Sequence, residues 1–205
     1  MKLRRKVRTL VAALAALSLC AAIAGAQESR EPPAMSPEER ALVEKWSAFT
    51  TPGAEHAWLA ERVGTWTARV KVWATPDSEP QIFEGTAEYR MILGGRFLED
   101  RTTATFDGGA FEGLGYTGFD NLKKKFVYAW MDSMGTSIFT GEATLDPATG
   151  VLTSVSEAPD LATGKYKKIR GTETRIDANT FRSEMFDTTP DGKEFRSMES
   201  VYRRK

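Results

Sequence analysis

The feature that most constrains the fold is an alternation of apolar and polar residues that begins at Gly64 and recurs almost to the C-terminus. In the first segment, Trp66, Ala68 and Val70 would share one face, with polar residues between them. Successive side chains of a strand point to opposite faces, so this alternation indicates strands half buried around one core. The further predicted strands are 81–93, 96–106, 111–119, 125–132, 136–145, 151–158, 165–176, 180–188 and 193–204.

Turn sequences rich in Gly, Asp, Asn and Pro separate these segments, among them Gly94-Gly95, Asp107-Gly108-Gly109 and Pro190-Asp191-Gly192. No helical interval is long enough to connect parallel strands, which favours an antiparallel meander of about ten strands. Closing the sheet would remove both of its edges. We therefore predict an all-β, up-and-down barrel preceded by short helices, and a β-sandwich is the structural alternative.

The predicted first and last strands carry a specific pair of residues. Gly64-Thr65-Trp66 opens the first strand and Arg203 lies near the end of the last. In lipocalin-like (calycin-like) barrels the Gly lets the first strand begin tightly, the Trp closes one end, and an Arg covers the indole as a cation–π partner. We predict that Gly64, Trp66 and Arg203 close the barrel in this way.

Two short helices are predicted before the barrel. Ser36-Pro37-Glu38-Glu39 combines an N-cap, a first-turn proline and a capping-box glutamate, which predicts a helix from Pro37 to Phe49. A second helix follows Pro52 and carries His56 on its apolar side. We expect these helices to cover an end of the barrel or its wall, with His56 as a packing residue.

The N-terminal segment is typical of a secretory signal peptide. Five Lys and Arg residues precede an apolar stretch that ends in Ala24-Gly25-Ala26. The apolar stretch is short for a membrane span, which needs roughly 20 residues. We predict a signal peptide over 1–26, a leader with the first helix over 27–51, and the barrel domain over 52–205. The protein is then exported, to the periplasm or the medium; a lipoprotein acylated at Cys20 is the alternative.

The composition excludes several kinds of site. Cys20 is the only cysteine, so the mature chain has no disulfide and no thiol nucleophile. Signal removal leaves 23 Lys and Arg against 28 Asp and Glu, a charge of −5, which disfavours nucleic acid as a partner. His56 is the only histidine and no ligand-spaced cluster accompanies it, so neither a metal nor another cofactor is predicted.

Several motifs resemble the bacterial family called domain of unknown function 1579. The resemblance implies a calycin-like barrel over about residues 53–205 and no established activity. The motifs that carry it are His56-x-Trp58-Leu59, Val63-Gly64-x-Trp66, Leu93-Gly94-Gly95-Arg96-Phe97-Leu98, Gly115-Tyr116-x-Gly118-Phe119-Asp120, Trp130-Met131-Asp132-Ser133-Met134-Gly135-Thr136 and Tyr202-x-Arg204-Lys205.

Aromatic and acidic residues alternate on faces that we expect to point inward. Tyr128, Trp130 and Asp132 share one face of a predicted strand, and Glu199 shares a face with Arg203 on the last strand. With Tyr89, these residues form the predicted ligand site. The alternative for Asp132 is a cap on the turn from Ser133 to Gly135, because a buried carboxylate needs a partner.

Three functions are compatible with this pattern. The first is an exported protein that binds a small, mostly apolar or amphipathic ligand inside the barrel. The second is a metal-independent acid–base enzyme that uses Tyr128, Asp132, Glu199 and an arginine. The third is a structural or protein-interaction domain of the cell envelope, which an interior filled by the barrel's own side chains would favour.

Overall fold

The computed structural model describes residues 35–161 and 163–205. The predicted signal peptide, its Cys20 and the leader up to residue 34 lie outside the described residues. The chain forms two compact units that divide between Arg40 and Ala41. The described part of the first unit begins helix α2 (Pro37–Thr50) with the predicted capping box. In it the Glu39 N–H donates to Ser36 Oγ over 3.2 Å, and the Ser36 N–H donates to the Glu39 carboxylate over 2.8 Å.

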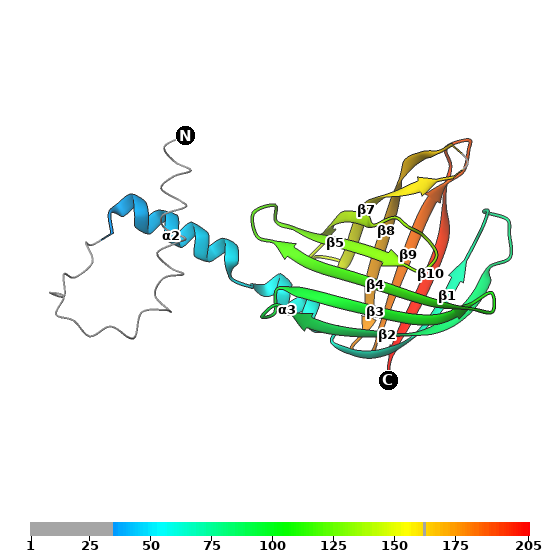
Figure 1. Cartoon of the computed structure of the whole chain (residues 1–205), viewed down its shortest axis with the longest axis horizontal. Helices are drawn as coiled ribbons and strands as arrows, with labels where there is room; N and C mark the ends of the chain where they lie inside the picture. Colours follow the sequence, from blue (N-terminus) through cyan, green and yellow to red (C-terminus); the bar gives the residue numbers. More distant parts are fainter. Residues whose placement is uncertain (1–34, 162) are drawn as a thin grey trace, which may run out of the picture. The chain divides into compact units, whose positions relative to one another are not determined.

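The second unit contains a closed barrel of ten antiparallel strands (Figure 1). Every strand pairs with its neighbours in sequence, and β1 pairs with β10 to complete the ring. The up-and-down barrel is confirmed, and the sandwich alternative is wrong. The strands are β1 (Gly64–Val72), β2 (Gln81–Ile92), β3 (Phe97–Phe106), β4 (Gly109–Asp120), β5 (Lys125–Asp132), β6 (Phe139–Leu145), β7 (Val151–Asp160), β8 (Lys165–Asp177), β9 (Thr180–Thr188) and β10 (Glu194–Arg204).

Helix α3 (Ala54–Ala60) packs on β2, β3 and β4 at one end of the barrel, which we call the α3 end (Figure 1). Its Leu59 is fully buried, and His56 is buried with its Nδ1 accepting the Gly53 N–H over 3.0 Å. Burial lowers the pKa of His56. The structure thus confirms His56 as a packing residue. No residue of α2 is buried, and its apolar side chains at Leu42 and Trp46 are exposed.

The hydrophobic core fills the barrel near the α3 end. Inward residues of several strands meet there, and aromatic rings contact one another edge to face, as Trp66 and Phe181 do with centroids 5.0 Å apart. The buried members include Leu59, Trp66, Tyr89, Leu98, Phe126, Leu152 and Phe181. This end is therefore closed by side chains, and the end with the β1–β2, β3–β4 and β5–β6 turns, which we call the far end, is the remaining way into the barrel.

Arg204, and not the predicted Arg203, closes the barrel over Trp66. Its guanidinium carbon lies 4.2 Å from the centre of the Trp66 ring, and it donates hydrogen bonds to the carbonyls of Val63 and Glu61. Gly64 has a φ of +132°, and a Cβ there would lie 2.7 Å from an Arg204 nitrogen. Gly64 therefore makes room for the arginine as well as for the chain bend.

A β-bulge explains why the prediction was one residue off. The register of β10 on β9 shifts between Arg196 and Met198, so residues before and after this point follow opposite alternations. If the inward alternation that includes Phe195 is continued across the bulge, it places Arg203 on the inner face, but Arg203 is exposed. Beyond the bulge the inward residues are Ser200, Tyr202 and Arg204, opposite Val70, Ala68 and Trp66 of β1.

Replacing Arg204 should therefore destabilise the barrel, and replacing Arg203 should not. We expect Arg204→Ala to lower the free energy of unfolding by about 2 kcal/mol, through loss of the cation–π contact and two hydrogen bonds. Arg203→Ala is the matched control and should change it by less than about 0.5 kcal/mol. Urea unfolding of the two variants makes the measurement, and equal effects would contradict the assignment.

Candidate functional site

Four neighbouring strands bring predicted and unpredicted residues into one row on the inner face. In the strand register Tyr89 of β2 lies opposite Asp100 of β3, Asp100 opposite Gly115 of β4, and Gly115 opposite Trp130 of β5. Asp132 lies opposite Gly113, two residues along from Gly115. Trp130 and Asp132 are therefore neighbours at this wall and Asp100 lies two strands from Trp130, whereas Tyr89 lies three strands from Trp130 and is buried in the core.

Inward glycines hold the aromatic rings against the barrel wall. A Cβ added at Gly113 would lie 2.3 Å from the Trp130 ring, and one at Gly115 would lie 3.0 Å from it. A Cβ added at Gly141 of β6 would lie 2.4 Å from the Tyr128 hydroxyl. The indole of Trp130 thus lies over β4 and the ring of Tyr128 over β6.

The inner face near the far end is reached by solvent. Its apolar side chains are only half-buried, although ten paired strands surround them. We call the interior that this half of the inner face surrounds the lumen. The half-buried apolar residues of this wall are Val72, Phe83, Phe106, Phe111, Tyr128, Trp130, Phe139, Met185 and Met198.

Asp132 holds Trp130 in place and also ends β5. The indole Nε1–H of Trp130 donates to Asp132 Oδ2 over 2.9 Å, and the Met134 N–H donates to Oδ1 over 3.0 Å. The second bond is the turn cap that the sequence analysis kept as an alternative. Asp132 therefore combines a structural role with a place beside the lumen.

Asp100 is the acidic residue of the site that the sequence analysis missed. Thr102 Oγ1–H donates to Asp100 Oδ1 over 2.9 Å, and the Tyr89 hydroxyl also hydrogen-bonds this carboxyl. Burial raises the pKa of Asp100 to about 6, against the hydrogen bonds and the nearby Arg62. Burial also raises the pKa of Tyr89, and that of Tyr202 to about 12. Asp100 shares the alternation of Leu98 and Phe106, which could have identified it.

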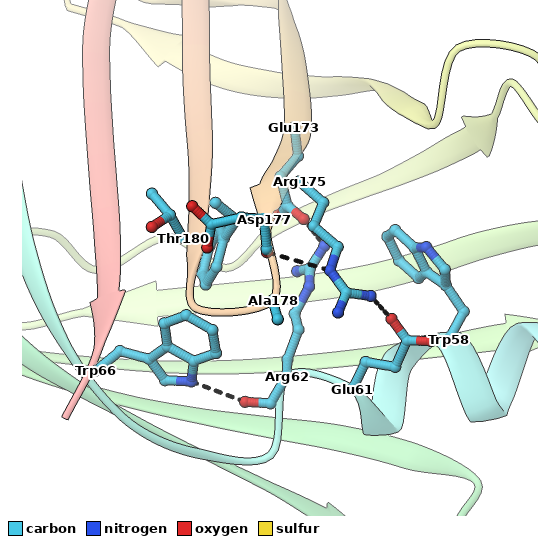
Figure 2. A pocket seen from close by; sticks show the side chains of 10 residues that line it. Trp58, Glu61, Arg62, Trp66, Glu173, Arg175, Asp177, Ala178 and Thr180 are labelled. Carbon is cyan, nitrogen blue, oxygen red and sulfur yellow. Dashed lines mark hydrogen bonds and ion pairs between the residues drawn. The ribbon is translucent and has the colours of Figure 1, made fainter.

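Arg62 enters the barrel at the α3 end. Its guanidinium carbon lies 4.8 Å from the Trp58 ring centre and 5.2 Å from that of Phe181, and it pairs with the inward Glu173 (Figure 2). Burial lowers the pKa of Arg62. The hollow that these residues line measures about 20 Å³, room for about one water molecule. It is too small for an organic ligand.

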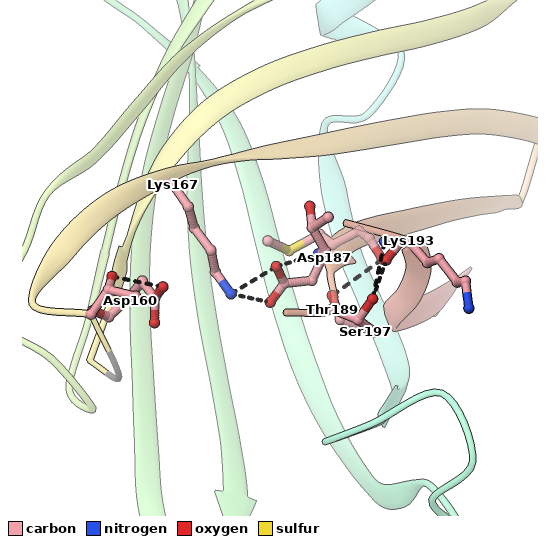
Figure 3. Close-up of polar contacts among 9 residues, drawn as sticks. Asp160, Lys167, Asp187, Thr189, Lys193 and Ser197 are labelled. Carbon is pink, nitrogen blue, oxygen red and sulfur yellow. Dashed lines mark hydrogen bonds and ion pairs between the residues drawn. The ribbon is translucent and has the colours of Figure 1, made fainter. Parts of the chain in front are cut away.

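A second inward ion pair lies in the far half of the barrel. Lys167 Nζ of β8 lies 2.8 Å from both carboxylate oxygens of Asp187 of β9 (Figure 3). Ser197, the residue at the bulge, lies in the same region and donates to the Met185 carbonyl.

Glu199 lies outside the barrel, so its predicted place in the ligand site is wrong. Its carboxylate pairs with Lys71 over 3.3 Å and with Arg196 over 2.8 Å on the outer face. The cause is the same bulge in β10, which inverts the alternation. Tyr128, Asp132 and Glu199 therefore do not converge, and the acid–base site proposed from them does not exist.

Residues 35–161 and 163–205 contain no group of three or more His, Cys, Asp or Glu side chains that could hold a metal ion. No helix in this part of the chain is long and apolar enough to cross a membrane.

The titration of Asp100 should be visible in protein stability. The pKa of Asp100 is about 6 in the folded state and near 3.8 when unfolded, because burial penalises the charged carboxylate. The fold is therefore more stable below about pH 4, where Asp100 is neutral, and this contribution to the free energy of unfolding is lost as the pH rises through 6. Relative to Asp100→Asn, the wild type should lose about 2 to 3 kcal/mol between pH 4 and 7.5. Urea unfolding at both pH values tests this, and a constant difference between the two proteins would contradict it.

Comparisons with known proteins identify the fold and the family. No curated protein matches the chain. The crystal structure of Rv2717c from M. tuberculosis is similar at 15% identity and a TM-score of 0.52, over 76% of this chain and 99% of that one. A de novo designed fluorescence-activating β-barrel is similar at 17% identity and a TM-score of 0.39, over 70% of this chain and 93% of the design. The model of the family described as "Protein of unknown function (DUF1579)" matches residues 51–204, so the chain belongs to this family.

Proposed function

We propose that this barrel binds a small, mostly apolar ligand in the far half of its lumen. The observation that carries the proposal is the half-buried apolar inner wall, with Trp130 and Tyr128 held flat against it by Gly113, Gly115 and Gly141. A barrel filled by its own side chains would bury these residues and would favour a purely structural role. Small barrels of this kind can hold one small ligand.

The chemistry of the wall supports an apolar ligand with a few polar contacts. Each 100 Å² of apolar wall that a ligand removes from water gains about 2.5 kcal/mol. Part of this gain is spent on the ligand's lost freedom of motion. Hydroxyl groups between the apolar side chains could orient a polar group, as is usual in small-molecule sites. Inward hydroxyl residues outside the core include Thr102, Thr117, Tyr128, Ser154, Ser156 and Ser183.

The place of action that we propose is outside the cytoplasm. The basic, apolar and small-residue parts of 1–26 support a cleaved secretory signal, with the mature chain starting at Gln27. Release into the periplasm or the medium follows from this, and acylation of Cys20 is the alternative.

Filling the lumen should abolish ligand binding. N-phenyl-1-naphthylamine, a neutral apolar dye that fluoresces in dry sites, is the probe, titrated into the purified mature protein. Ser156→Phe places a ring on the inner face of β7 and should weaken dye binding at least about tenfold by occupying the space. Val155→Phe places the same ring on the outer face, where Val155 is 48% exposed, and should leave binding unchanged. Equal effects, or no dye binding by the wild type, would contradict the proposal.

Export should be visible in the mature N-terminus. We expect protein purified from the periplasm or the medium of its own host to begin at Gln27, as measured by intact mass and N-terminal sequencing. A mature chain that begins at an acylated Cys20 would establish the lipoprotein alternative. An uncleaved chain in the cytoplasm would contradict export.

A further inference from the structure

We infer that the lumen selects ligands that carry a positively charged nitrogen beside an apolar or aromatic group. This inference rests on the proposed function and specifies the class of its ligand. It follows from how the inward charged side chains are paired, and from the position of two carboxylates relative to Trp130.

Two pairs of inward charges neutralise each other. Arg62 pairs with Glu173 near the α3 end, and Lys167 pairs with Asp187 in the far half. Each positive group is therefore matched by a carboxylate in direct contact. Neither pair leaves a net charge for a ligand to meet.

Asp100 and Asp132 differ from these carboxylates. The hydrogen bonds to Asp100 come from the hydroxyls of Thr102 and Tyr89, and those to Asp132 come from the Trp130 indole and a backbone N–H. All of these donors are neutral. Among the described residues, no Lys, Arg or His nitrogen lies within 4.0 Å of either carboxylate. The inner wall thus carries negative charge that no direct ion pair cancels, with Arg62 acting on Asp100 only at longer range.

Both carboxylates lie beside the same aromatic ring. Asp132 accepts the indole N–H of Trp130, and Asp100 is separated from Trp130 by Gly115 alone in the cross-strand row. Because Gly115 has no side chain, nothing from β4 stands between the Asp100 carboxylate and the indole. The face of a Trp ring attracts cations more strongly than that of Tyr or Phe. Trp130, Asp100 and Asp132 together form a site for a cation with an apolar neighbour.

The same arrangement disfavours anionic and neutral ligands. An anion in the lumen would be repelled by the two carboxylates on its wall. A neutral ligand would gain contact with the aromatic wall and leave both carboxylates partly desolvated without a counter-charge. A cationic ligand gains the wall contact and provides that counter-charge.

The test compares two compounds of the same shape that differ in charge. Phenyltrimethylammonium and its neutral isostere tert-butylbenzene are each used at pH 7.5 to displace bound N-phenyl-1-naphthylamine. The hydrophobic effect alone favours the neutral compound. We expect the cation to displace the dye at about tenfold lower concentration, the size of a desolvated cation–π contact.

Matched variants assign this preference to the inner carboxylates. Asp132→Asn keeps a side chain that can cap the turn and should reduce the preference for the cation several-fold, as should Asp100→Asn. Glu112→Gln removes the same charge from the exposed outer face of β4, next to Gly113, and should leave the preference unchanged. The two inner variants need not be equally stable, and dye affinity shows that each remains folded.

The outcomes separate this inference from the proposed function. If the dye binds and tert-butylbenzene competes as well as the cation, the charge preference is wrong and the lumen still binds apolar ligands. If the preference survives in both Asp132→Asn and Asp100→Asn, the assignment to these carboxylates is wrong. If neither the dye nor the cation binds, as checked for the cation by calorimetry, both proposals are wrong.

Discussion

The pairing of β1 with β10 is the interaction on which the rest of this structure depends. It turns a meander with two free edges into a ring, and only a ring separates an inner face from an outer one. Arg204 secures this closure, because one side chain covers Trp66 and reaches the carbonyls of Val63 and Glu61. The closure therefore joins the last strand both to the first strand and to the segment that follows α3.

Within the ring, side-chain size is distributed unevenly. Near the α3 end, large residues such as Phe126 and Phe181 belong to one buried cluster and exclude solvent. In the far half, glycines lie opposite aromatic residues, so each ring lies flat on the neighbouring strand instead of crossing the centre. The same residue types thus build a filled core at one end and a lined space at the other. The difference lies in which residue stands opposite each ring.

Much of this architecture could be predicted from the sequence, because it depends on local patterns. Alternation and turn residues located all ten strands, and the short connections implied the antiparallel order. The inward positions of Tyr128, Trp130 and Asp132 followed from the same alternation. Glu199 and Arg203 were misplaced because the bulge after Arg196 inverts the alternation, and no residue type marks it. The pairing of Asp100 with Tyr89 depends on strand register, which single-strand patterns do not contain.

The inward glycines also determine how substitutions can change the shape of the barrel interior. Gly113, Gly115 and Gly141 contribute backbone pairing through their strands, and none of the three has a positive φ. The missing side chain at Gly113 and Gly115 makes room for the Trp130 ring, and that at Gly141 makes room for both the Tyr128 ring and the Val155 carbonyl of β7. A substitution at Gly113 or Gly115 would therefore reshape the enclosed space while leaving the ladder of the barrel wall in place. Different members of such a fold could accommodate differently shaped molecules on one unchanged scaffold.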